Sequence, residues 1–254
     1  MEIYLDNCAT TRVCHEAAAA CLRVMTEDYG NPSSLHKKGM EAENILTSAR
    51  RTIGKMLGCD GDCVIFTGSA TESNNLAILG AAAANPRGGK TIVTTTVEHP
   101  SVAKTVEYLE EQGYTVRRVA PKPDGNFDPQ DFLDAVDADT LLLTFMMVNN
   151  EMGTVLPYQA VIPALKKKYP RLMIHMDVVQ GFAKYPLSVK RLDVDLLTFS
   201  GHKLYAPKGI GALYVKKGVR LKPVIHGGGQ EKGLRSGTHA VQLAAGLQEA
   251  LELC

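Results

Sequence analysis

The stretch Leu172-Met173-Ile174-His175-Met176-Asp177 is a short, mostly apolar run that ends in a carboxylate. An apolar run of this length between polar segments is typical of a buried β-strand. A carboxylate directly after such a strand is poorly solvated and favours a cationic partner. The stretch therefore predicts a core strand with a functional group, Asp177, at its carboxyl end.

Similar runs recur on both sides of this stretch and alternate with stretches of helical character. Strands are predicted over 63–67, 91–97, 114–119, 141–146, 172–176, 196–199 and 212–215. Helices are predicted over 71–84, 101–112, 129–136, about 162–168 and 240–253, the last without a capping signal, as if it were cut. This alternation indicates an α/β fold with a mostly parallel central sheet sandwiched by helices.

Composition narrows the classes of function. The 254 residues suffice for one large domain or a domain and a half, and 45% of them are apolar. The net charge is +1, and acidic and basic residues are interspersed. The sequence therefore shows no basic patch of the kind that binds nucleic acid or an acidic membrane surface. No apolar run approaches the roughly 20 residues of a membrane span. Because residues 1–6 lack the features of a signal peptide, we expect a cytoplasmic protein.

The chain has six cysteines, at positions 8, 14, 21, 59, 63 and 254. In a reducing cytoplasm these are expected to be free thiols. Cys59 and Cys63 have the spacing of half a zinc site, but no second Cys/His pair accompanies them. We therefore expect no metal.

Polar residues that follow the predicted strands are the candidate site residues, because mostly parallel sheets bind ligands at the carboxyl ends of their strands. The segment Gly68-Ser69-Ala70-Thr71-Glu72 follows the strand over 63–67. Ser69 and Glu72 fit a capping box, so this turn is expected to open a helix. The N-terminus of a helix suits a phosphate, although a capping box alone is weak support for one.

Four further segments follow strands. Glu98-His99 and Asn149-Asn150 supply a histidine and two amides, which can serve a ligand or merely hold a turn. Asp177-x-x-Gln180 supplies a carboxylate and an amide. Ser200-Gly201-His202-Lys203 supplies a lysine whose pKa can be lowered at a buried sheet edge, which suits Schiff-base chemistry. A surface lysine is the alternative, but the five sites together supply the different groups that one cofactor needs.

The segments occur in a fixed order along the whole chain: Asn7-Cys8-Ala9-Thr10-Thr11, Gly30-Asn31-Pro32, Ala70-Thr71-Glu72-Ser73, Glu98-His99, Val148-Asn149-Asn150-Glu151, Asp177-x-x-Gln180, Ser200-Gly201-His202-Lys203, Pro207-Lys208-Gly209-Ile210-Gly211 and Arg235-Ser236-Gly237-Thr238. In this order they resemble the nitrogen-fixation and iron–sulfur-cluster type of cysteine desulfurase, in the class V aminotransferase group. The resemblance implies the large domain of a fold type I transferase that depends on pyridoxal phosphate.

The resemblance also implies roles for individual residues. Lys203 would bond covalently to pyridoxal phosphate, Asp177 would pair with the pyridinium nitrogen, and His99 would stack on the ring and assist proton transfer. Lys203 and His99 would thus be the catalytic residues. The remaining cofactor-binding residues would be Gln180 and Asn150 at the ring oxygen, Ala70, Thr71, Ser200 and His202 at the phosphate, and Thr238 at the phosphate of a second subunit in a homodimer.

In the family's reaction, L-cysteine gives L-alanine and an enzyme persulfide, whose sulfur passes to a scaffold or acceptor protein for iron–sulfur clusters or tRNA thiolation. The family's nucleophilic cysteine and its substrate-binding arginine belong to a C-terminal small domain, which we expect to be absent from this chain. Residues 1–14 are expected to belong with that small domain, and residues 15–254 to form the cofactor-binding large domain.

Two alternatives to this reading remain open. A selenocysteine lyase, or another class V enzyme, shares the framework of lysine, aspartate and histidine. The segments Ser200–Lys203 and Arg235–Thr238 favour the desulfurase. The second alternative is a cofactor-binding fragment without catalytic activity, which a cysteine-dependent alanine or sulfide assay would reveal.

Overall fold

A seven-stranded sheet forms the centre of the computed structural model, which describes residues 3–254. Its strands are β1 (Val64–Thr67), β2 (Thr91–Thr95), β3 (Thr115–Val119), β4 (Thr140–Met146), β5 (Met173–Asp177), β6 (Leu196–Ser200) and β7 (Gly211–Val215), in the spatial order β1-β7-β6-β5-β4-β2-β3. The neighbours from β3 through β6 pair in parallel. The predicted mostly parallel sheet is confirmed, with strand ends shifted by at most two residues.

Strand β7 departs from the parallel pattern, because it pairs antiparallel with both of its neighbours, β6 and β1. The reason is the short connection over 201–210 between β6 and β7. A parallel crossover needs a dozen or more residues, usually including a helix, whereas a short loop returns the chain antiparallel. Lys203 lies in this loop, at the carboxyl end of β6.

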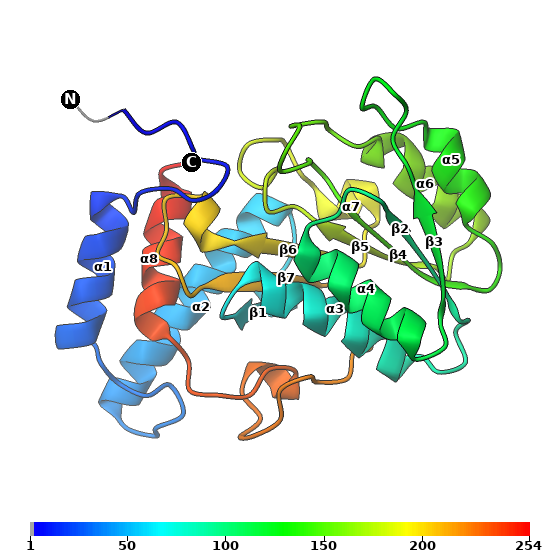
Figure 1. Cartoon of the computed structure of the whole chain (residues 1–254). Coiled ribbons are helices and arrows are strands. Elements are labelled where there is room, and N and C mark those ends of the chain that lie inside the picture. The colour runs from blue at the N-terminus through cyan, green and yellow to red at the C-terminus, as the bar shows by residue number, and fades with distance from the viewer. Residues whose placement is uncertain (1–2) are drawn as a thin grey trace.

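Helices cover both faces of the sheet (Figure 1). One face carries α3 (Ala70–Ala84) and α4 (Pro100–Glu111), and the other carries α2 (Lys37–Leu57), α5 (Pro129–Ala135) and α6 (Tyr158–Lys168), with the short α7 (Val189–Leu192) beside α6. The predicted helical layers are therefore confirmed. None of the helices within residues 3–254 is both long and apolar enough to cross a bilayer.

The core is divided by the sheet, because successive side chains of a strand point to opposite faces. Leu143 and Phe145 of β4 belong to the large cluster beneath α2, α5 and α6. Leu142, which immediately precedes Leu143 in sequence, belongs to the cluster beneath α3 and α4. Burial on both faces explains the nearly continuous apolar runs of the central strands.

Besides the short α7, two helices were not among the elements predicted from the sequence, namely α1 (His15–Thr26) and α2. They pack with α8 (Val241–Glu252) at one end of the molecule, where α1 and α8 lie side by side (Figure 1). The buried residues of α2 recur at helical spacing, as Ala42, Leu46, Ala49, Ile53 and Leu57. This periodicity is the signal that would have revealed the helix.

Candidate functional site

A cavity of about 530 Å³ lies at the carboxyl ends of the strands. Nine of the ten predicted site residues line it: Ala70, Thr71, His99, Asn150, Asp177, Gln180, Ser200, His202 and Lys203. They follow five different strands, whose carboxyl ends meet at this edge of the sheet. The tenth, Thr238, does not line the cavity and is exposed to solvent.

Asp177 is the last residue of β5 and is only 6% exposed. Its Oδ2 accepts a hydrogen bond from Asn74 Nδ2 at 2.8 Å, and its Oδ1 accepts one from the backbone N–H of Val179 at 3.0 Å. Burial raises the pKa of Asp177, and these hydrogen bonds together with the charges of His99 and Lys203 oppose that rise. Among residues 3–254 the carboxylate forms no direct ion pair, so its free acceptor capacity suits a cationic group of a ligand.

Lys203 ends the 3₁₀ turn Gly201–Lys203 that follows β6. Its ammonium group donates hydrogen bonds to the carbonyl oxygens of Cys8 and of Ala9, the latter at 2.8 Å. Burial lowers the pKa of Lys203, with opposing contributions from Cys8, which raises it, and Lys184, which lowers it. A lysine with a lowered pKa is more readily available as a neutral, nucleophilic amine.

The segment before α1 forms one wall of the cavity. The backbone N–H and the hydroxyl of Thr11 both donate to the carbonyl oxygen of His202 at 2.9 Å, and the Tyr205 N–H donates to the Thr11 hydroxyl at 2.8 Å. Gln180 Nε2 donates to the Cys8 carbonyl at 2.9 Å. The sequence contained this segment as a motif, but nothing in its residue types showed which strand end it would join.

His99 is the N-cap residue of α4, and its ring is exposed at the cavity. The ring nitrogen Nδ1 accepts the backbone N–H of Ser101 at 3.1 Å and lies 2.8 Å from the Ser101 hydroxyl. Because Nδ1 accepts a backbone N–H, a neutral ring carries its proton on Nε2. That nitrogen can therefore donate or exchange a proton with a ligand.

The turn before α3 offers a site for an anion. The Ser69 hydroxyl accepts the Glu72 N–H at 3.2 Å, as the predicted capping box requires. The Glu72 carboxylate, however, accepts the N–H of Gly68 at 2.9 Å instead of that of Ser69. The first N–H groups of α3 lack partners within the helix and lie at the cavity, where Ala70 and Thr71 form part of its wall.

Gly211, the first residue of β7, lets this turn approach the sheet. A Cβ atom at Gly211 would lie 2.7 Å from the carbonyl carbon of Ser69, which is closer than real Cβ contacts. Only glycine fits here without movement of the turn. The close packing of β7 against the start of α3 thus fixes the position of the anion site.

Arg235 connects the segment 235–238 to the same turn. Its Nε donates to Glu72 Oε1 at 2.7 Å and its Nη2 donates to Glu72 Oε2 at 3.3 Å. The pair neutralises a carboxylate that would otherwise repel an anion at the start of α3. Sequence reasoning placed both residues in motifs but did not foresee that they pair.

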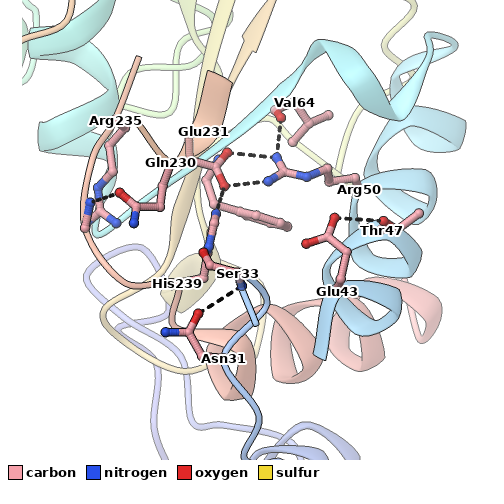
Figure 2. Close-up of polar contacts among 12 residues, drawn as sticks. Asn31, Ser33, Glu43, Thr47, Arg50, Val64, Gln230, Glu231, Arg235 and His239 are labelled. Carbon is pink, nitrogen blue, oxygen red and sulfur yellow. Dashed lines mark hydrogen bonds and ion pairs between the residues drawn. The ribbon is translucent and has the colours of Figure 1, made fainter. Parts of the chain in front are cut away.

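Glu231 anchors the loop that carries Thr238, and Figure 2 shows its contacts with Arg50 and His239. Its carboxylate, with the side chain 1% exposed, receives two hydrogen bonds from Arg50 (2.8 and 2.5 Å) and one from His239 Nε2 at 2.7 Å. These partners lower the pKa of Glu231, although burial, the largest single influence, acts to raise it. Glu231 and Lys232 both have positive φ, so the buried ion cluster holds a strained turn in place.

Two buried titratable groups near Asp177 belong to segments quoted from the sequence but were assigned no role there. His175 is hydrogen-bonded to the hydroxyls of Thr144 (2.8 Å) and Thr198 (3.0 Å), and burial lowers its pKa to about 3. Burial raises the pKa of Glu98 to about 8. Both pKa shifts favour the neutral form at pH 7, so both groups add little charge beside Asp177.

All six cysteines lie within the described residues and are free thiols. Cys8 is exposed and lines the cavity, whereas burial raises the pKa of Cys59 to about 12. Within residues 3–254, no group of three or more His, Cys, Asp or Glu side chains has an arrangement that could hold a metal ion.

The arrangement is suited to a ligand with several distinct groups. Asp177 can pair with a cationic N–H, the start of α3 can hold an anion, and Lys203 can attack a carbonyl carbon between them. His99 can exchange a proton at the same cavity.

Comparison with known proteins places these features in a family context. The model of the family described as aminotransferase class V matches residues 3–254. A cysteine desulfurase of Trichormus azollae is 43% identical over 251 residues, which are 99% of this chain and 62% of that protein. The chain thus spans less than two thirds of the length of this curated relative.

Solved structures give the same result for the fold. A NifS-like protein superimposes with a TM-score of 0.96 at 40% identity, covering 100% of this chain and 69% of that one. A structure described as SspA in complex with cysteine superimposes with a TM-score of 0.94 at 37% identity, covering 99% of this chain and 72% of that one.

Proposed function

Because the chain belongs to the class V aminotransferase family, we propose that it forms the pyridoxal-phosphate-binding part of a cysteine desulfurase. The observation that carries the proposal is that the Lys203 amine, the Asp177 carboxylate and the start of α3 line one cavity. The similarity to cysteine desulfurases over 99% of the chain supports the choice of reaction within the family.

The residues of the cavity fit pyridoxal phosphate. The buried Asp177 carboxylate has acceptor capacity for a pyridinium N–H, and the N–H groups of Ala70 and Thr71, which open α3 at the cavity and have no partner within the helix, suit the phosphate. We assign Lys203 to the covalent bond with the cofactor. Ring contacts are assigned to His99, Gln180 and Asn150, and phosphate contacts to Ala70, Thr71, Ser200 and His202.

Pyridoxal phosphate, when bound, withdraws electrons from the bonds of the attached substrate. The protein's own residues supply the binding and proton chemistry around it. Asp177 holds a positive charge at the ring nitrogen, and the carbonyls of Cys8 and Ala9 orient the Lys203 amine. His99, with Nδ1 fixed by Ser101, presents Nε2 to move a proton.

The proposal also covers the substrate, the partner proteins and the cellular location. The substrate is L-cysteine and the products are L-alanine and a persulfide, whose sulfur passes to an acceptor or scaffold protein for iron–sulfur clusters or tRNA thiolation. Residues 15–254 form the cofactor-binding domain, and residues 1–14, of which 1 and 2 lie outside the described residues, belong with a small domain. The exposed Thr238 completes the phosphate site of a second subunit in a cytoplasmic homodimer.

The test measures cofactor binding and turnover separately. The protein is loaded with pyridoxal phosphate, and its visible absorption and the formation of alanine from L-cysteine are recorded. Asp177→Asn is expected to lower cofactor retention by at least about tenfold, because a buried cationic ring nitrogen loses its counter-charge. Failure of the wild-type protein to bind the cofactor would refute the proposal.

Two results would select an alternative instead. Cofactor binding without alanine formation would indicate a cofactor-binding chain that is not active by itself. Faster turnover of L-selenocysteine than of L-cysteine would indicate a selenocysteine lyase.

A further inference from the structure

Asn74 lies in α3, next to the cavity but not in its wall. The residue is fully buried, with 0% exposure. It follows the residues that form the anion site, yet its side chain points to the carboxylate of β5 and to the start of α4. A buried primary amide in the interior of a helix calls for a physical reason, because asparagine is a poor helix former.

Both hydrogens of the Asn74 amide group are used. Nδ2 donates to Asp177 Oδ2 at 2.8 Å and to the Ser101 hydroxyl oxygen at 2.8 Å. The orientation of the amide is fixed by chemistry, since an ionised carboxylate only accepts hydrogen bonds. The other amide atom, Oδ1, is buried and has no hydrogen-bond partner among the described residues. A buried acceptor without a partner lowers the stability of the fold. The two hydrogen bonds that Nδ2 donates are the contacts that offset this cost.

Ser101 extends the connection to His99. Its hydroxyl oxygen accepts from Asn74, which leaves the hydroxyl hydrogen free to be donated to His99 Nδ1 at 2.8 Å. Ser101 itself is 8% exposed, so little water competes for these bonds. A continuous path therefore joins the Asp177 carboxylate to the His99 ring through one amide and one hydroxyl.

We propose that Asn74 is a positioning residue that, together with Ser101, fixes the Asp177 carboxylate and the His99 ring relative to each other. Asn74 does not line the cavity, so it acts only through these two residues. The consequence for pyridoxal phosphate rests on the proposed function, in which Asp177 and His99 are both ring contacts.

The electrostatics of Asp177 agree with this geometry. Burial raises its pKa, and the hydrogen bond from Asn74 is the largest influence that opposes the rise. The other titratable groups that act on this carboxylate are His99, Lys203 and Glu98. Without the Asn74 donor, the Asp177 carboxyl is expected to hold its proton to higher pH and to be less often ionised.

The first test uses the cofactor-free protein, in which Asp177 is observed by carbon-13 NMR and His99 by nitrogen-15 NMR. Asn74→Leu removes both donors at similar volume, and Asn74→Ala is the second variant should leucine impair folding. The midpoint of the Asp177 titration is expected to rise in both, and the His99 Nδ1 resonance to shift. Unchanged Asp177 and His99 signals in a folded variant would overturn the proposal.

Matched variants separate the effect of the Asn74–Asp177 hydrogen bond from that of the Ser101–His99 hydrogen bond. Ser101→Ala is expected to shift the His99 Nδ1 resonance while leaving most of the Asp177 titration in place, because the Asn74–Asp177 bond remains. Asn85→Leu removes an amide at the C-cap of the same helix, whose side chain bonds to the Ala81 carbonyl, and is expected to change neither signal. An equal effect of Asn85→Leu would show that the changes report only helix stability.

The second test measures the affinity for pyridoxal phosphate by titration. A hydrogen bond to a charged group supports a loss of about ten- to a hundredfold in Asn74→Leu. Wild-type protein that fails to bind would refute the proposed function, whereas binding that is equal in wild type and Asn74→Leu would refute only the role of Asn74.

Discussion

The side chain of Lys203 donates a hydrogen bond to the backbone carbonyl of Cys8, 195 positions earlier in the chain. The bond holds the amine against a wall that belongs to another segment. Because the acceptor is a backbone atom, substitution of the Cys8 side chain leaves it in place. This contact, with the second bond to Ala9, shows that Lys203 is not an ordinary lysine of a surface loop.

Replacement of Lys203 by alanine is expected to abolish covalent fixation of pyridoxal phosphate. Borohydride reduction of the loaded wild-type protein should label one lysine, which peptide mass spectrometry identifies as Lys203. Lys208→Ala removes an exposed lysine that does not line the cavity, and it should label like the wild type. Equal labelling of Lys203→Ala would contradict the assignment.

Cys8 should be protected by the cofactor. Its thiol is exposed and lines the cavity, so bound pyridoxal phosphate is expected to slow its alkylation by at least about tenfold. Cys254, which is also exposed but lies outside the cavity, provides the internal reference. Alkylation rates at the two thiols are compared by mass spectrometry with and without cofactor. The same rate at Cys8 in both conditions would place the cofactor elsewhere.

The Arg235–Glu72 pair should govern affinity for the phosphate group. Arg235→Gln leaves an unpaired carboxylate beside the start of α3, which is expected to weaken pyridoxal phosphate binding about five- to tenfold. The double variant Glu72→Gln, Arg235→Gln removes both charges and should restore much of the loss. Pyridoxal, which lacks the phosphate, serves as the control ligand. A similar loss for both ligands would mean that the pair supports the fold and not the phosphate.

His175 should make the protein less stable as pH falls below about 6.5. Its pKa in the folded protein is about 3, so only the unfolded chain binds this proton between the two values. Proton uptake by the unfolded state lowers the free energy of unfolding by about 1.4 kcal/mol per pH unit in that window.

Urea unfolding at pH 5 and pH 7 checks this expectation. In His175→Gln, the free energy of unfolding should no longer carry the His175 contribution to its difference between pH 5 and pH 7. In His226→Gln, a substitution at an exposed position, that contribution should remain. If the free energy of unfolding of His175→Gln differed between pH 5 and pH 7 as much as that of the wild type, the buried histidine would not be the cause of the pH dependence.

Glu98, in contrast to His175, should make the protein less stable as pH rises. Its pKa of about 8 in the folded protein exceeds the usual value, so the folded state keeps a proton that the unfolded chain has released. The free energy of unfolding should therefore fall by about 1.4 kcal/mol per unit as pH rises between about 4.5 and 8. Glu98→Gln should remove this decline between pH 6 and pH 8, and a decline of the same size in the variant would contradict the prediction.

The strands and the group of residues at their carboxyl ends were predictable because each strand leaves a local signal. Asp177 and Lys203 follow apolar runs directly, and the parallel sheet brings such positions to one edge. Nine of the ten residues named from the sequence line one cavity for this reason.

Other features depend on contacts that no local pattern records. The direction of β7 follows from the length of one loop, and the partner of Arg235 is 163 positions away. Asn74 looks like any polar residue of a helix until α4 and β5 are placed beside it. The missed helix α2 is different, because its buried stripe was present in the sequence.

The docking of Thr11 on His202 joins residues 191 positions apart. Closing so long a loop costs entropy before any contact repays it, and contacts of this separation are slow to form. During synthesis the wall beside Lys203 cannot assemble until β6 and its turn have emerged from the ribosome. The pocket therefore exists only once Thr11 has docked on the turn after β6, and a ligand of the pocket can select only chains in which this contact has formed.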